Sequence, residues 1–324
     1  MKLLRRPLTF LLIAVLLFGA AGCSAGAQPP AEPKYQAPPA YYEKVSEDAE
    51  EVRAPAPAPL PPPAVEEEPE PEAEVSARVR APDLDAIAQL DAQPHGWGHG
   101  GPVDEFNRST GALLFQNRYS HLDAHFIKPD SQRIYLTFDQ GFEYGFTPVI
   151  LDTLRDRGVP AAFFLTKHFA TEHPDLVRRM IDEGHVLANH TVRHRRFPEM
   201  TLQDAMDDVM ELHDYVLENF GYEMHLFRFP EGVFNEQTLA LLQSLGYTSV
   251  FWSFAYRDWV LDDQPLTIEA TNLMVSRAHP GAIYLLHSVS RTNSEVLDEV
   301  IGLLKADGFE FGLLDLPAPE LPQQ

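Results

Sequence analysis

The chain has 324 residues, and its 25 basic against 48 acidic residues give a formal charge of -23. That charge repels the phosphate backbone of nucleic acids, so nucleic-acid binding is excluded as the expected function. The chain contains 28 prolines, and its composition changes sharply near residue 80. This change predicts one folded domain behind a tail.

The N-terminus has the pattern of an export signal. Basic residues near the start precede the apolar run Leu8 to Gly22, which is shorter than the roughly 20 residues that a spanning helix needs. The run ends at Cys23, the only cysteine, and resembles a bacterial lipoprotein signal, although Ala20 stands where leucine is usual. This resemblance implies a lipid on Cys23 and an anchor on the outer face of the cytoplasmic membrane. An ordinary cleaved signal with a stray thiol is the alternative.

Residues 24–92 are predicted to be a disordered tether. The Pro59 to Pro63 and Glu66 to Glu72 tracts are too polar and too extended to bury a core. Within the tether only Leu84 to Leu90 has the pattern of a short helix. We expect the folded domain at residues 93–318.

The start of this domain has little pattern. His95 to Gly101 is predicted to be a surface loop rather than a metal site, because no carboxylate is near it in the sequence. Phe115 to Phe126 has no clean period.

From Arg133 onward, buried strands alternate with helices. Apolar runs predict strands at Ile134–Phe138, Ala161–Leu165, Val186–Ala188, Leu226–Phe229, Ser249–Trp252, Ala282–Leu286 and Phe309–Leu314. Helical spacing predicts helices at Pro148–Arg157, Asp175–Glu183, Leu202–Phe220, Gln237–Leu245 and Glu295–Ala306, with glycines 158, 184, 246 and 308 at helix ends. Periodicity alone leaves a closed barrel and an open doubly wound sheet as alternatives.

Reactive side chains follow these strands where each strand ends. In chain order they are Asp139 and Gln140, then Asn189 to His194, then Arg228 to Gly232, then Arg257 to Trp259, and finally His287. Because the carboxyl ends of parallel strands share one edge of the sheet, we expect these residues to form one pocket. No glycine-rich phosphate loop follows a strand, so nucleotide binding is not expected.

His190 and His194 are four residues apart. If their turn is helical, both imidazoles face one point and form half of a site for a divalent ion such as zinc. Two ordinary polar histidines are the alternative reading.

These strand-end motifs together resemble the polysaccharide deacetylase family, also called the NodB-homology domain, over residues 130–316. The segments Asp139–Glu143, Val250–Ser253, Asp258–Trp259 and His279–Arg291 are most similar to the subgroup of peptidoglycan de-N-acetylases that form muramic δ-lactam. The resemblance implies a distorted (β/α) barrel of about seven strands and metal-dependent removal of N-acetyl groups.

The resemblance also implies a role for each site residue. Asp139 is the expected general base, and Arg228 orients it and keeps it ionised. His287 is the expected general acid, and Asp258 orients it. His190 and His194 are the expected metal ligands, with zinc as the first choice of metal.

One residue departs from the family pattern. Most members carry a second aspartate where this chain has Gln140, and the δ-lactam subgroup usually has asparagine there. An amide oxygen is a weaker ligand than a carboxylate, so Gln140 is an uncertain third metal ligand.

The residues expected to bind substrate are Pro230, Glu231, Trp259 and Arg193. The backbone N–H after Pro230 is the expected donor to the tetrahedral oxyanion. Arg193 belongs to a basic cluster with Arg195 and Arg196, and guanidinium suits a substrate carboxylate. A solvated charged turn is the alternative for this cluster.

Three functions remain open on the sequence. The first is a muramic acid de-N-acetylase leading to δ-lactam. The second is the same chemistry on N-acetylglucosamine of peptidoglycan or chitin-type oligomers. The third is a catalytically inactive wall-binding lipoprotein. The expected partners are the peptidoglycan glycan strand and, through Cys23, a membrane; no protein partner is predicted.

Overall fold

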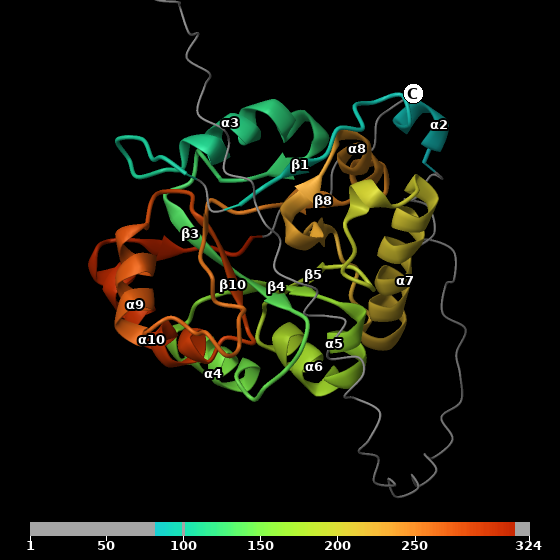
Figure 1. Cartoon of the computed structure of the whole chain (residues 1–324). Coiled ribbons are helices and arrows are strands. Elements are labelled where there is room, and N and C mark those ends of the chain that lie inside the picture. Colours follow the sequence, from blue (N-terminus) through green and yellow to red (C-terminus); the bar gives the residue numbers. More distant parts are fainter. Residues whose placement is uncertain (1–81, 99–100, 315–324) are drawn as a thin grey trace, which may run out of the picture. The chain divides into compact units, whose positions relative to one another are not determined.

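The computed structural model describes residues 82–98 and 101–314 (Figure 1). The predicted signal, Cys23 and the predicted tether as far as residue 81 lie outside these residues. In the described part of the chain, no helix combines the length and the apolar character needed to cross a membrane.

The domain is built on a nine-stranded sheet in which every strand pair is parallel. Its order is β2 (Ala124–His125), β8 (Thr248–Val250), β6 (Leu226–Phe227), β5 (Val186–Asn189), β4 (Ala161–Leu165), β3 (Arg133–Gln140), β10 (Ile283–His287) and β9 (Phe254–Ala255), with β11 (Glu310–Phe311) beside the start of β3. The architecture is the expected distorted (β/α) barrel. All seven predicted strands are present, and the very short β2 and β9 are additional.

Strand β3 lies inside this sheet, and its burial explains its sequence. Arg133 is exposed, and all seven following residues are buried. Parallel strands are covered on both faces, so they are apolar without alternation. The polar members Thr137, Asp139 and Gln140 are exceptions that each have a specific partner, described below.

Helices follow most of the strands and surround the sheet (Figure 1). They are α4 (Thr147–Arg157), α5 (Lys167–Glu172), α6 (Pro174–Asp182), α7 (Leu202–Phe220), α8 (Glu236–Ser244), α9 (Thr267–Ser276) and α10 (Arg291–Ala306). Five correspond to predicted helices, whereas α5 and α9 were not predicted. The four glycines predicted at helix ends all have positive φ, between 59° and 90°.

The segment before β3 is folded onto the domain, which corrects two expectations. The described segment includes α2 (Leu84–Ile87), β1 (His95–Gly96) and α3 (Thr110–Tyr119). Gln237 on α8 donates hydrogen bonds to the carbonyls of Ala88 and Leu90, at 3.0 and 3.1 Å, so the folded domain begins before residue 93. The predicted loop at His95 to Gly101 contains β1, which pairs antiparallel with β7 (Val233–Phe234).

Aromatic packing fixes this segment in place. Phe126 stacks on Phe251 with ring centroids 4.2 Å apart, and Phe115 packs against Phe126 at 5.4 Å. Buried Gln116 accepts a hydrogen bond from the Phe126 N–H at 2.8 Å. The segment before β3 therefore packs into the same hydrophobic core as the barrel.

Candidate active site

The polar strand ends meet at one edge of the sheet, as predicted. Asp139 on β3 and His287 on β10 are register partners on adjacent strands. His190 directly follows β5, and the Arg228 N–H bonds to the Asn189 carbonyl at 3.0 Å. The sheet thus brings together residues that are far apart in the sequence.

Arg228 holds Asp139 from inside the protein. Its guanidinium is fully buried and donates to Asp139 Oδ1 at 2.8 Å, to Thr137 Oγ1 at 2.9 Å and to the Val250 carbonyl at 3.1 Å. It also lies 3.9 Å from the centre of the Phe164 ring. Burial alone would raise the pKa of Asp139, but the charge and hydrogen bond of Arg228, together with His190 and His287, outweigh burial, and the pKa lies below its ordinary value. Asp139 is therefore a fixed, ionised carboxylate.

His190 and His194 face each other, but not by helical spacing. Their ring centroids are 4.8 Å apart at 81°, and the loop between them has left-handed φ values of 76° at Thr191 and 49° at His194. The His194 N–H donates to Thr191 Oγ1 at 2.8 Å, which stabilises this turn. The two histidines lie together, although the turn between them is not helical.

The proton positions on His190 bear on metal binding. Its Nδ1 lies 2.9 Å from the Arg228 carbonyl, which can only accept, so Nδ1 carries the proton. Burial lowers the pKa of His190, and burial lowers the pKa of His194 to about 3. In the neutral ring the Nε2 lone pair then faces Asp139 Oδ2 at 3.4 Å. Two facing acceptors favour a cation between or beside them, so the donor set fits a divalent ion.

Gln140 points away from Asp139, because successive residues of a strand face opposite sides. Its amide nitrogen donates to Ser288 Oγ, and its oxygen lies 3.5 Å from Thr147 Oγ1. Its role as a third metal ligand stays a prediction. Within residues 82–98 and 101–314, no cluster of three or more imidazole, thiolate or carboxylate groups is arranged to hold a metal.

Asp258 orients His287 on the opposite side of the site. Its Oδ1 lies 2.7 Å from His287 Nδ1, and its Oδ2 accepts from the His287 N–H at 2.8 Å and from Asn293 Nδ2 at 2.6 Å. Burial would lower the pKa of His287, but the Asp258 carboxylate, through its charge and hydrogen bond, and the charge of Asp139 together outweigh burial and raise the pKa above its ordinary value. The Trp259 ring packs 5.5 Å from the imidazole. His287 is thus suited to carry a proton.

The turn Pro230–Gly232 brings Glu231 to the site in a strained conformation. Glu231 has a φ of 56°, and Gly232 has a φ of 67°. Arg196 donates to Glu231 Oε2 through two nitrogens, at 2.6 and 2.9 Å. Together with Thr191 and His194, Glu231 places three left-handed non-glycine residues in the loops of this site, which is where such strain tends to gather in enzymes.

Two tryptophans that were not predicted to matter hold this turn. The Trp97 N–H donates to the Gly232 carbonyl at 2.9 Å, and its indole donates to the Trp252 carbonyl at 2.8 Å. The Trp252 indole donates in return to the Gly98 carbonyl at 2.8 Å. The two tryptophans are 155 positions apart in the sequence, so no local pattern could have paired them.

Arg193 is already paired within the protein. It lies 3.1 Å from Asp208 and 3.4 Å from Glu211. These carboxylates would compete with a substrate carboxylate for the guanidinium. The structure thus places Arg193 beside the histidine loop, with both terminal nitrogens of its guanidinium already paired with carboxylates.

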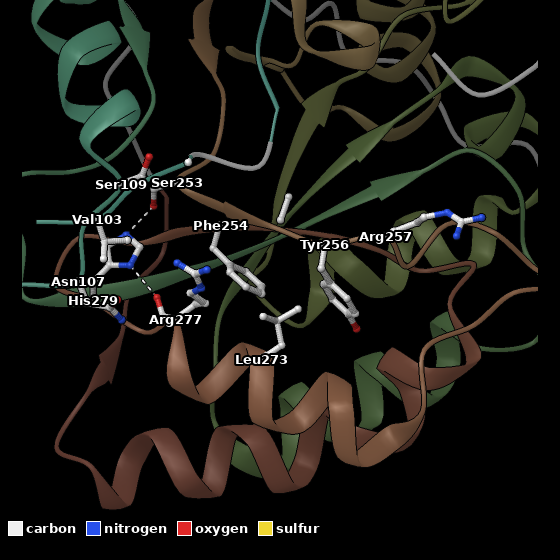
Figure 2. Close-up of a pocket in the computed structure, with 12 residues that line it drawn as sticks. Val103, Asn107, Ser109, Ser253, Phe254, Tyr256, Arg257, Leu273, Arg277 and His279 are labelled. Carbon is white, nitrogen blue, oxygen red and sulfur yellow. Dashed lines mark hydrogen bonds between the residues drawn. The ribbon is translucent and has the colours of Figure 1, made fainter. Parts of the chain in front are cut away.

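A separate cavity of about 330 Å³ lies beside β9 (Figure 2). Its wall includes His279, which bridges Ser253 Oγ and the Arg277 carbonyl, each at 2.8 Å. Of the strand-end residues expected to form one pocket, Arg257 alone lines this cavity. His279 has both ring nitrogens satisfied and links β9 to the end of α9.

Comparison with known proteins identifies the family of this chain. The model of the polysaccharide deacetylase family matches residues 127–250. The chain belongs to this family of deacetylases, and its fold is the one that the family resemblance implied.

The similar proteins include deacetylases that act on peptidoglycan. The chain is 39% identical over 233 residues to the peptidoglycan-N-acetylmuramic acid deacetylase PdaA of Bacillus subtilis, covering 70% of this chain and 88% of PdaA. The solved structure of that protein, a family 4 carbohydrate esterase, aligns with a TM-score of 0.66 and 36% identity, over 70% of this chain and 97% of that one. The peptidoglycan-N-acetylglucosamine deacetylase PgdA of Listeria monocytogenes is 30% identical over 185 residues, which are 57% of this chain and 38% of PgdA.

Proposed function

We propose that this protein hydrolyses the N-acetyl group of N-acetylmuramic acid in peptidoglycan, using a divalent metal and leading to muramic δ-lactam. The observation that carries the proposal is the paired arrangement of Asp139 and His287. They occupy matched positions on adjacent strands, and their environments move their pKa values in opposite directions. The similarity to PdaA supports muramic acid as the sugar.

The residues account for each proton in the hydrolysis. Ionised Asp139, held by Arg228, accepts a proton from the water that attacks the acetamide carbon. The Glu231 N–H, held in its turn beside Gly232, is the proposed donor to the developing oxyanion. Protonated His287 gives its proton to the departing nitrogen, so that the products are acetate and a free amine.

His190 and His194 are the proposed metal ligands, with zinc as the first choice of metal. When bound there, a divalent ion would supply Lewis acidity to the acetamide oxygen and the attacking water. The neutral imidazoles and the fixed tautomer of His190 suit this role. Gln140 is the proposed third, neutral ligand.

N-acetylglucosamine is the second candidate substrate, favoured by the similarity to PgdA. The acetamide that reacts is the same in both sugars, so Asp139 and His287 serve either reaction. The sugars differ in the lactyl ether of muramic acid, and the distinction must come from residues beside the acetamide.

We further propose that the protein is exported and held at the outer face of the cytoplasmic membrane by a lipid on Cys23. The signal-like run before Cys23 supports this placement. A Cys23→Ala variant should be released into the medium. Membrane retention of that variant would contradict the proposal.

The function is tested by analysing the products of purified protein on glycan strands. The substrates are strands with peptide-free muramic acid and N-acetylglucosamine oligomers, each with and without a chelator. Acetate release followed by δ-lactam on the first substrate, abolished by the chelator and by Asp139→Asn, is the expected result. Glucosamine as the sole product would favour the second candidate, and no acetate from either would indicate an inactive wall-binding protein.

A further inference from the structure

The lactam chemistry restricts where the substrate carboxylate lies. A peptide-free muramic acid carries a lactyl carboxylate on the carbon next to the one that bears the acetamide. Closing the δ-lactam joins this carboxyl group to the nitrogen that hydrolysis frees. Because His287 protonates that nitrogen, a residue that binds the carboxylate belongs on the His287 side of the site. This inference rests on the proposed function.

A cavity of about 480 Å³ adjoins the loops on that side. Its lining includes Tyr144, Phe146, Asp262, Gln264, Val289 and Arg291. The Ser290 N–H donates to the His287 carbonyl at 3.2 Å, so a tight turn brings the start of α10 close to the general acid. Gln264 donates to the Asp258 carbonyl at 2.8 Å and accepts from Ser290 Oγ at 2.7 Å. The cavity wall and the Asp258–His287 pair are therefore one connected structure.

Arg291 lies on the His287 side of the site and has free donors. Arg195 likewise makes no hydrogen bond or ion pair among the described residues, but it lies next to His194 on the histidine loop. Arg193 faces two carboxylates, and Arg196 is bound to Glu231. Arg257 is paired with Asp263 at 2.7 Å. Only Nε of Arg291 has a partner among the described residues, Glu295 at 2.7 Å, and its side chain is 71% exposed. Its two terminal nitrogens remain available to a ligand.

We propose that Arg291 binds the lactyl carboxylate of peptide-free muramic acid through these terminal nitrogens and so selects this sugar over N-acetylglucosamine. A planar guanidinium matches a carboxylate with two parallel hydrogen bonds. The rings of Tyr144 and Phe146 supply apolar surface for the lactyl methyl group and the sugar face.

Asp262 lines the same cavity and carries the opposite charge. Its carboxylate repels an anionic ligand and limits the affinity. Removal of this charge should therefore strengthen binding of the free acid, in the direction opposite to the loss of Arg291. The cavity thus provides two variants with opposite expected effects.

The experiment compares peptide-free muramyl glycan, the same glycan with its lactyl carboxylates converted to methyl amides, and an N-acetylglucosamine oligomer. Arg291→Gln should raise KM for the free acid by about tenfold to a hundredfold, the range for a lost hydrogen bond between charged groups, with little change for the two neutral substrates. Arg291→Lys should fall between wild type and Arg291→Gln, and Asp262→Asn should lower KM for the free acid alone. Arg155→Gln, at an exposed position of α4, is the matched control.

The outcomes separate this inference from the proposed function. If wild type turns over the muramyl substrates and Arg291→Gln affects all three substrates equally, the carboxylate role is wrong and the proposed function stands. If wild type acts on the N-acetylglucosamine oligomer alone, the proposed function and the inference fail together. A selective rise in KM for the free acid supports both.

Discussion

Asp258 contacts His287 twice, through the imidazole Nδ1 at 2.7 Å and through the backbone N–H at 2.8 Å. The carboxylate therefore fixes the ring orientation as well as its charge. The remaining ring nitrogen, Nε2, is left as the atom that can transfer a proton. The position of Nε2 is set by the β10 backbone together with the Asp258 carboxylate.

This contact predicts the alkaline limb of the pH profile. The raised pKa of His287 keeps the imidazole protonated to higher pH, and activity should fall as pH rises through that pKa. Asp258→Asn removes the charge that raises the pKa, so the alkaline limb of kcat/KM should move to lower pH. His287→Ala should lower kcat by about 10² to 10⁴ at every pH. An unchanged alkaline limb in Asp258→Asn would show that this pair does not set it.

Arg228 supports both stability and the acid limb. Arg228→Met leaves the Asp139 carboxylate buried without its cation, and breaking such a pair costs about 3–5 kcal/mol of unfolding free energy. Without Arg228, burial raises the pKa of Asp139, so activity should be lost at a higher pH on acidification. Denaturant unfolding and pH–rate profiles measure the two effects. Arg157→Gln, which breaks an exposed pair with Asp298, should change neither.

Metal affinity tests the histidine pair and Gln140 separately. His194→Ala should weaken zinc binding, measured by competition with a fluorescent chelator at fixed pH. Gln140→Asp should strengthen it, because a carboxylate is a stronger ligand than an amide. Equal affinity in wild type and Gln140→Asp would mean that residue 140 acts through Ser288 and not on the metal.

Gly232 is the tightest point of the substrate-binding turn. A Cβ there would lie 2.6 Å from the Trp97 carbonyl oxygen and 2.9 Å from the Trp252 ring, at a φ of 67°. Gly232→Ala should therefore displace the turn and lower kcat as well as stability. Gly246→Ala is the matched control, since it has a φ of 80° and open space around its Cβ, and its cost should be only the left-handed backbone, about 1–3 kcal/mol. Equal losses of stability and unchanged kcat in both variants would argue against a role for the tryptophan contacts.

Sequence periodicity predicted the helices that bury one face and the strands that are buried on both faces. The α7 helix has its predicted bounds because Thr201 caps its start, and Gly221 ends it with a φ of 64°. The β3 run was recognisable because burial on both faces requires unbroken apolar character. The convergence of strand ends followed from parallel topology alone.

Helices α9 and α3, which were not predicted, have apolar residues at exposed positions, so their sequences lack a single apolar face. Helix α9 has no side-chain cap and exposes Leu266 and Ile268, at 65% and 63%, so its apolar residues do not mark one face. Helix α3 likewise exposes Leu114 and buries Gln116. Both depend on tertiary contacts that a single sequence does not display.

The site could be predicted residue by residue but not in its local geometry. The spacing of His190 and His194 suggested a helical turn, yet the loop needs a left-handed threonine and a left-handed histidine, which local preference disfavours. The contacts of Trp97 with Trp252 and Gly232 join segments that are distant in the sequence, and the sequence of one segment does not predict its contact with the other.

The register between β3 and β10 fixes the backbone distance between the two residues that are proposed to transfer protons in the reaction. Neighbouring strands lie about 4.8 Å apart, so the backbone spacing between Asp139 and His287 is a property of the hydrogen-bond ladder and not of the surrounding loops. Helices and loops can therefore change without altering the span between proton acceptor and proton donor. A single residue inserted in β10 before Leu286 would turn the His287 side chain to the other face and bring Leu286 into its place.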